Sequence, residues 1–271
     1  METTSQHLSP SPILPLLEPV DGGLLATFVE SGRSWIGMHG GLVVATLAEA
    51  AAQATGRVPV AVTAHLHSAV DPGQAAVTVT TASAGRTVTS ATAMLDQGRR
   101  RATASVVLVA DVEAGDEVTH WPAGRRDLSG LPSPDAVERL AGFEDAVPFA
   151  GSVDIRPVAG SRPFGGGDRP VLTAWVRLLS APADRPAVPL VLLDALAPSL
   201  YAVRTAPVPI PTVEYTVHLS PVRPTDEWFL IEQRTTWSTD SFCIDEADLL
   251  TPDGRLVASS RQLRRILSMP A

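Results

Sequence analysis

The same order of predicted secondary-structure elements occurs twice along the 271 residues of the sequence. In the first copy, Gly40-Gly41 open a stretch dominated by alanine and leucine, and Gly56 supplies a stop, as expected of a helix. This helix is apolar on nearly every face, which predicts burial. Alternating, β-branched stretches separated by turn residues then predict an antiparallel meander over residues 58–69, 76–82, 87–95 and 102–110.

The second copy follows a segment rich in proline, glycine and acidic side chains. Residues 112–150 are predicted to form this linker, with a short helical stretch over 133–143. A second apolar helix is predicted over residues 189–201. The same patterns predict strands before and after it, over residues 153–158, 171–179, 212–220, 228–237, 242–250 and 255–266.

Local echoes support a duplication of this α+β unit. HLHSAVDPG at 65–73 is matched by VHLSPVRPT at 217–225, and the hairpin at 95–105 is matched at 252–260. Repeated supersecondary units keep such an order along a chain. We therefore predict two domains, joined edge to edge into one continuous sheet. Their expected bounds are residues 1–111 and 151–271, with the linker 112–150 crossing between them.

Composition and charge exclude several classes of function. All 21 basic residues are arginine, and asparagine is absent too, so a lysine Schiff base, a P-loop lysine and a Cys-His-Asn triad are excluded. A net charge of −8, with Arg99–Arg101 as the only run of three arginines, predicts no nucleic-acid partner. The single cysteine, Cys243, excludes an intrachain disulfide.

The N-terminal stretch METTSQHLSPSPILPLLEP has no basic region, and prolines interrupt its apolar residues, so we predict no signal peptide. No apolar run reaches the roughly 18 residues that suggest a membrane helix. These features predict a cytoplasmic protein without a membrane partner.

Short motifs in both halves follow a common order and spacing. They are His39-Gly40-Gly41, Val70-Asp71-Pro72-Gly73, Gly85-Arg86-Thr87, Ile155-Arg156-Pro157-Val158, Leu193-Asp194, Pro211-Thr212-Val213-Glu214, Asp226-Glu227-Trp228 and the run from Asp253 to Gln262. On these motifs the sequence resembles the acyl-CoA thioesterase II family over nearly its full length. The resemblance implies an α+β double hot-dog fold, in which an antiparallel sheet wraps a central helix twice. It also implies a thioester hydrolase that needs no metal or redox cofactor.

The resemblance implies a water-binding trio of aspartate, threonine and glutamine, which falls on Asp194, Thr212 and Gln262. Thioester hydrolysis needs a carboxylate to deprotonate a positioned water, and donors for the oxyanion that develops. Asp194 also stands out without the resemblance, because it is the only charged residue in VPLVLLDALAPSLY. Burial should raise the pKa of its carboxyl, which suits a general base.

Simpler interpretations of the trio exist where the resemblance is set aside. Asp194 could be a core carboxylate bound to backbone amides or an arginine. Thr212 would then be an ordinary strand threonine, and Gln262 a glutamine on an edge strand.

His39, Gly40 and Gly41 are the predicted substrate-binding residues. Glycine lets a ligand approach the backbone, and a helix N-terminus presents free N–H groups to negative charge. The resemblance implies that the carboxylate and the oxyanion-binding helix end come from opposite halves, here Asp194 and the Gly41 N–H. Tight packing is the alternative for the glycines, and helix-start hydrogen bonding is the alternative for His39.

Two other residue sets are predicted to be inactive. His65 and His67 point to one face of a strand, but no third ligand is identifiable, so we predict no metal site. The counterparts of the trio in the first half are Glu49, Val60 and Val107, so we predict one active site per chain. A nucleophile elbow of the form G-x-S-x-G is also absent from the sequence.

The predicted partner is an acyl-CoA or acyl-carrier thioester, bound in an apolar tunnel between the halves. One alternative is a hot-dog hydratase, dehydratase or tailoring enzyme, for which His39 has no acidic partner nearby in the sequence. The other is a non-catalytic acyl-CoA- or lipid-binding protein, because folds alone do not carry function. Since single hot-dogs pair, we also expect two or more chains to associate as a homo-oligomer.

Overall fold

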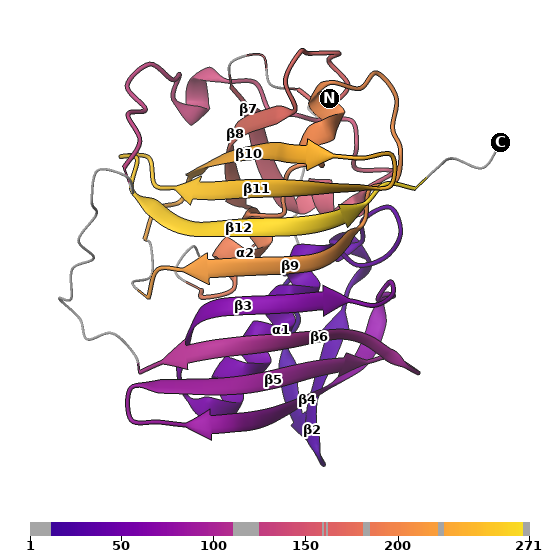
Figure 1. Ribbon diagram of the computed structural model, residues 1–271, viewed down its shortest axis with the longest axis vertical. Helices are drawn as coiled ribbons and strands as arrows, with labels where there is room; N and C mark the ends of the chain where they lie inside the picture. The colour runs from indigo at the N-terminus through magenta and orange to yellow at the C-terminus, as the bar shows by residue number, and fades with distance from the viewer. Residues whose placement is uncertain are drawn as a thin grey trace, which may run out of the picture.

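The computed structural model describes residues 12–110, 125–158, 160, 162–180, 185–221 and 225–267. Within them, the strands form one twelve-stranded antiparallel sheet, which runs the length of the molecule in Figure 1. The first half contributes, in spatial order, β1 (Leu17–Val20), β2 (Gly23–Phe28), β4 (Gly73–Ala84), β5 (Val88–Asp96), β6 (Arg100–Val109) and β3 (Val58–Leu66). The second half continues with β9 (Thr212–Leu219), β12 (Leu256–Arg265), β11 (Phe242–Leu250), β10 (Phe229–Ser238), β8 (Val171–Leu178) and β7 (Val153–Pro157). The second half therefore repeats the first in mirrored order, as a duplication predicts.

The two halves join through β3 and β9, which pair antiparallel at the middle of the sheet. Val62 lies opposite Val217 and Thr63 opposite Thr216. The hydroxyls of Thr63 and Thr216 are 3.1 Å apart, and they add a side-chain hydrogen bond to the ladder. Without this pairing β3 and β9 would each present an unpaired edge. The predicted edge-to-edge continuous sheet is confirmed.

The helix α1 (Gly40–Thr55) lies behind β3 and β6, within the curl of the first half (Figure 1). Most of its residues are buried, and Leu42, Leu47 and Ala48 are almost completely so. Gly56 ends the helix in the left-handed conformation, with φ of 65°, a conformation that glycine adopts without strain. The predicted first helix is confirmed.

The second helix is much shorter than the pattern over residues 189–201 predicts. The α-helix α2 covers only Val188–Leu192, and a 3-10 turn, η5, follows at Ser199–Ala202. Pro198 prevents one helix from continuing to residue 201, because proline has no N–H to donate and disfavours helical geometry in the residue before it. Asp194 lies in the turn that follows α2, where its N–H donates to the Val191 carbonyl at 3.2 Å.

Within the described residues, three further 3-10 turns are η1 (Glu30–Gly32), η3 (Pro134–Ala136) and η4 (Pro148–Ser152). The helical stretch predicted over 133–143 is therefore wrong, since only one turn forms there. The described part of the linker contacts both halves: Trp175 Nε1 of the second half donates to the Pro132 carbonyl at 2.8 Å, and the Phe149 N–H donates to the Arg33 carbonyl of the first half at 2.9 Å. Residue 111, the last of the predicted first domain, and residues 112–124 of the predicted linker lie outside the described residues. The domain bounds and the association of chains stay predictions.

β1 and β2 were not predicted from the sequence. β1 has only four residues and contains Pro19, which cannot donate to a sheet ladder and is a signal against a strand. The strand is tolerated because it lies at the outer edge of the sheet, where one side of the ladder is unpaired. Among the described residues, no helix is both long and apolar enough to cross a lipid bilayer.

The equivalent hairpins of the two halves offer a test of how the linker packs. Gly98 and Gly254 both have positive φ, of 70° and 81°. A Cβ at Gly98 would meet nothing within 4 Å, whereas a Cβ at Gly254 would collide with the Arg126 carbonyl of the linker. We expect Gly98→Ala to lower the free energy of unfolding by about 1 kcal/mol, and Gly254→Ala by about 2–4 kcal/mol. Urea unfolding measures both, and equal losses would mean that the linker does not pack on this hairpin.

Candidate active site

Asp194 meets the N-terminus of α1 at the junction between the two halves. Its carboxylate Oδ2 accepts a hydrogen bond from the Gly41 N–H at 2.8 Å. A Cβ on Gly41 would lie 3.0 Å from Asp194 Cβ, and one on Gly40 would lie 3.0 Å from Asp194 Oδ2. Such contacts are tighter than ordinary packing allows, so both positions favour glycine for a reason of space.

Asp194, Thr212 and Gln262, which the sequence analysis singled out, lie together in the structure. Gln262 Nε2 donates to Asp194 Oδ1 at 2.9 Å, and the Thr212 hydroxyl donates to Gln262 Oε1 at 2.6 Å. Thr212 begins β9 and Gln262 lies in β12, the strand beside it. The three side chains therefore form a hydrogen-bonded chain that ends on the carboxylate.

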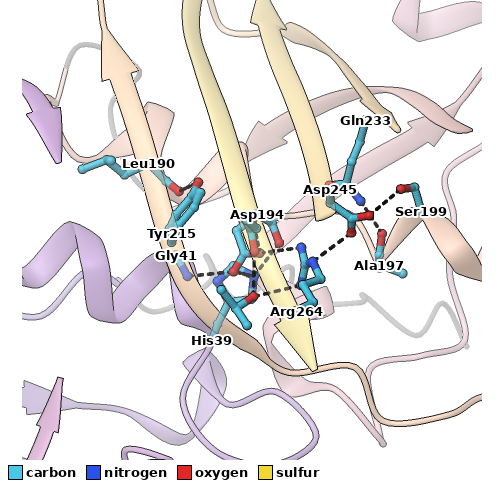
Figure 2. Close-up of polar contacts among 12 residues, drawn as sticks. His39, Gly41, Leu190, Asp194, Ala197, Ser199, Tyr215, Gln233, Asp245 and Arg264 are labelled. Atoms are coloured by element: carbon cyan, nitrogen blue, oxygen red, sulfur yellow. Dashed lines mark hydrogen bonds and ion pairs between the residues drawn. The ribbon is translucent and has the colours of Figure 1, made fainter. Parts of the chain in front are cut away.

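Arg264 also belongs to this group, although it was not among the site residues predicted from the sequence. Its Nη2 donates to Asp194 Oδ1 at 3.1 Å, and its Nη1 donates to the Thr212 hydroxyl at 3.0 Å. Figure 2 shows the guanidinium directly beside Asp194. The signal was present in the sequence, because residues two apart in a strand share a face and Arg264 follows Gln262 by two.

His39 lies on the other side of Asp194, directly before α1. Its Nε2 is 2.8 Å from the Asp194 backbone oxygen and 3.5 Å from Asp194 Oδ2. The imidazole stacks on Phe149, with 3.7 Å between ring centroids. Its Nδ1 is buried and has no hydrogen-bond partner within the described parts of the chain. His39 thus has the acidic neighbour that its sequence surroundings lack, and that neighbour comes from the other half.

The pKa of the Asp194 carboxyl shifts in the opposite direction from the prediction. Burial alone raises the pKa of its carboxyl, as expected. The His39 and Arg264 side chains, together with the hydrogen bonds from Gln262 and Gly41, outweigh burial and lower the pKa below its ordinary value. The predicted raised pKa is therefore wrong, because His39 and Arg264 lie beside the carboxylate and neither contact was predicted from the sequence.

The Gly41 N–H, predicted to bind the substrate oxyanion, already donates to Asp194. The N–H of Gly40, one residue earlier, has no acceptor within the described parts of the chain. Substrate binding by His39, Gly40 and Gly41 stays a prediction, with Gly40 as the residue whose N–H remains available.

A cavity of about 490 Å³ opens onto this group of residues. His39, Asp194, Thr212 and Arg264 face it, whereas Gln262 is buried behind them. The remaining wall is mainly apolar and comes from both halves, for example Trp35, Val43, Leu66, Ile155, Leu172 and Tyr201. Such a space suits an apolar chain that ends in a polar reacting group.

The other residue sets from the sequence analysis lie away from this cavity or bind other partners. Glu49 forms an ion pair with Arg185, with 2.9 Å between Oε1 and Nη2. His67 Nε2 lies 3.1 Å from the Thr103 hydroxyl. No group of three or more metal-ligating side chains occurs within the described ranges, His65 and His67 included.

His39 makes the stability of the protein depend on pH. Burial lowers the pKa of the imidazole below its ordinary value of 6.5, although Asp194 opposes this effect. The unfolded chain then binds the proton more readily than the folded one, so the free energy of unfolding should fall as the pH decreases below 6.5. Urea unfolding between pH 5 and about 7.5 should show a weaker pH dependence in His39→Gln than in the parent. His218→Gln, on the exposed face of β9, is the control and should behave as the parent does.

Known proteins with similar sequences and structures agree with this architecture. Residues 31–110 match the model of the acyl-CoA thioesterase N-terminal domain, and residues 126–266 match that of the C-terminal domain. The uncharacterized protein Rv0499 of Mycobacterium tuberculosis is 30% identical over 259 residues, or 84% of this chain and 86% of that protein.

Two solved structures show the same fold. A hot-dog protein of unknown function from Alicyclobacillus acidocaldarius has a TM-score of 0.82 at 20% identity, covering 95% of this chain and 98% of that one. The acyl-CoA thioesterase II TesB2 of Mycobacterium marinum has a TM-score of 0.65 at 14% identity, covering 93% and 96%. The double hot-dog fold is confirmed. With both halves matched in order by the two domain models, the chain belongs to the acyl-CoA thioesterase family.

Proposed function

We propose that the chain hydrolyses an acyl-CoA thioester with Asp194 as the general base. The observation that carries the proposal is the hydrogen bonding of its carboxylate. Oδ1 accepts from both Gln262 and Arg264, whereas Oδ2 accepts a hydrogen bond from the Gly41 N–H alone among the described residues, with His39 Nε2 at 3.5 Å. Each carboxylate oxygen can accept about two hydrogen bonds. One position on Oδ2 is therefore open to a water.

The chemistry needs only groups that lie at this end of the cavity. The water donates one proton to Asp194 as its oxygen attacks the thioester carbonyl carbon. The oxyanion that forms is stabilised by the Gly40 N–H at the start of α1, where the helix dipole favours negative charge. When the intermediate collapses, the carbon–sulfur bond breaks and the thiolate of CoA takes up the proton. Thr212 and Gln262 orient the carboxylate and hold the network.

Mutation of the trio tests the proposal. Asp194→Asn keeps the shape of the side chain but cannot accept the proton, so kcat should fall by about two to four orders of magnitude. Thr212→Ala and Gln262→Ala should lower kcat by a smaller factor, because these residues orient rather than accept the proton. Thiol release from acyl-CoAs of increasing chain length measures the rate.

Glu49→Gln is the matched control, because Glu49 is the counterpart of Asp194 in the first half and its carboxylate is bound to Arg185. It should keep the activity of the parent. If Asp194→Asn is as fast as the parent and Glu49→Gln is inactive, the site belongs to the other half. If the parent binds acyl-CoAs but releases thiol neither from acyl-CoAs nor from acyl-carrier thioesters, the protein is a binding protein instead.

A second candidate function rests on the contact between His39 and Asp194. An imidazole and a carboxylate within 3.5 Å of each other could exchange protons with a substrate, as adding or removing water at a carbon–carbon double bond requires. The buried, unpartnered Nδ1 of His39 belongs to the same pair.

Substrate choice separates the two functions. We expect the parent to release thiol from saturated acyl-CoAs and to leave the double bond of a 2-enoyl-CoA unchanged, as followed by its ultraviolet absorbance. His39→Gln should then retain most of the hydrolysis, since the proposed base is Asp194. Loss of the enoyl absorbance without thiol release, abolished in His39→Gln, would identify a hydratase.

A further inference from the structure

A second carboxylate lies behind Asp194, on the far side of Arg264. Asp245, in β11, pairs with Arg264 through Oδ2 and Nε at 2.8 Å. Figure 2 shows the guanidinium between the two carboxylates, with Asp245 on the side away from α1. Asp245 is 1% exposed and Arg264 is 4% exposed, so this charge cluster is almost fully withdrawn from water.

Two hydroxyl groups donate hydrogen bonds to the Asp245 carboxylate. Its Oδ1 accepts from the Thr235 hydroxyl at 2.6 Å and from the Ser199 hydroxyl at 3.0 Å. Hydrogen bonds to a carboxylate are charge-assisted and stronger than those between neutral groups. Asp245 therefore has its own stabilising shell, supplied by η5 and β10.

The cluster holds one more negative charge than positive charges. Burial opposes the charge on Arg264, but Asp245 and then Asp194 outweigh it and raise the pKa of the guanidinium, which stays protonated. Asp245 is the nearer partner, at 2.8 Å against 3.1 Å for Asp194. With His39 neutral near pH 7, one cation faces two carboxylates.

This imbalance matters for a general base. An Arg264 paired with Asp194 alone would hold that carboxylate strongly in its charged form and make it a poor proton acceptor. Asp245, on the opposite side of the guanidinium, offsets its positive charge. The effect of Arg264 on the proton affinity of Asp194 is therefore weaker. Arg264 can then orient Asp194 without removing its affinity for a proton.

We propose that Asp245 and Arg264 are positioning residues that set the proton affinity of Asp194 in opposite directions. The proposal rests on Asp194 acting as the general base of thioester hydrolysis. Arg264 lowers the affinity and Asp245, through Arg264, restores it. Neither residue needs to exchange a proton itself.

Most ionisable groups near Asp194 and Arg264 keep one charge state over the pH range of a rate measurement. Tyr215 and His39 face Asp194, Tyr201 and Cys243 lie near Arg264, and Arg204 lies near Tyr201 and Cys243. Burial raises the pKa of Tyr215 well above 10.0, and it raises the pKa of Tyr201 and of the Cys243 thiol to about 12. These three groups stay neutral from pH 4 to about 9. His39 can titrate in this range, so each variant is also compared in the His39→Gln background.

The test is the pH dependence of kcat/KM for variants at the two positions. Asp245→Asn can keep its hydrogen bonds, because the hydroxyls of Ser199 and Thr235 can accept as well as donate. It should move the acid limb of the profile to lower pH. Arg264→Gln should move the limb to higher pH, and Arg264→Lys, which keeps the charge, should bring it back toward the parent. The shift in Arg264→Gln should be about one pH unit or more, because the guanidinium lies 3.1 Å from the Asp194 carboxylate, and the shift in Asp245→Asn should be smaller, because Asp245 acts through Arg264.

The control pair lies on the same two strands. Glu246 and Arg261 are register partners in β11 and β12, directly after Asp245 and directly before Gln262, and Arg261 is exposed. Glu246→Gln and Arg261→Gln should leave the profile unchanged. A merely structural role for Asp245 and Arg264 would lower the rate without opposite shifts of the limb, and that result would overturn the proposal.

An independent measurement separates this proposal from the proposed function. The carboxyl ¹³C signal of Asp194, identified by its loss in Asp194→Asn, reports its titration without any turnover. Opposite movements of this titration in Asp245→Asn and Arg264→Gln support the charge relation even where no thioester is hydrolysed. Titrations that coincide with the parent's contradict it, whatever the activity of the enzyme.

Discussion

The backbone ladder between β3 and β9 is the constraint on which the site depends. It brings two copies of a small α+β unit into one sheet and sets the distance between their helices. The start of α1 and the end of α2 then meet, and the Gly41 N–H reaches the Asp194 carboxylate at 2.8 Å. A sheet ladder is stiff because each of its hydrogen bonds limits the slip of the others. The ladder therefore fixes where the two groups meet, and side-chain hydrogen bonds from Gln262 and Arg264 then orient the carboxylate.

The interruption of the second helix serves the same geometry. Pro198 has no N–H to donate to the Asp194 carbonyl, which lies four residues earlier, so that carbonyl would lack a helical partner even in a continuous helix. In the observed structure the Asp194 carbonyl is bound by His39, and the Ala197 carbonyl accepts from Gln233 Nε2 at 2.8 Å. Tyr215 anchors α2 from β9 through the Leu190 carbonyl at 2.9 Å. The proline thus interrupts the second helix, and Asp194 lies in a turn whose backbone carbonyls bind side chains from other elements.

The buried charges explain why this part of the core is polar. An isolated carboxylate in an apolar interior is costly, and each of the two here is compensated by a guanidinium and by several donors. Asp194 draws its partners from the start of α1 and from β12, whereas Asp245 draws its partners from η5, β10 and β12. Arg264 links the two sets. Loss of one member would leave another uncompensated, which makes the group act as a unit.

The sequence by itself determined the repeated α+β order, the buried first helix, the hairpins with their positive-φ glycines and the positions of Asp194, Thr212 and Gln262. These features depend on local periodicity, on turn chemistry and on motifs that a chain displays without being folded. The length of α2, the strand β1, the neighbours of His39 and the charge state of Asp194 depended on the tertiary structure. His39 and Asp194 are 155 residues apart in the chain, and Asp245 and Arg264 meet only through strand pairing. A pKa depends on the groups within a few ångströms, and no local pattern determines which distant side chains those will be.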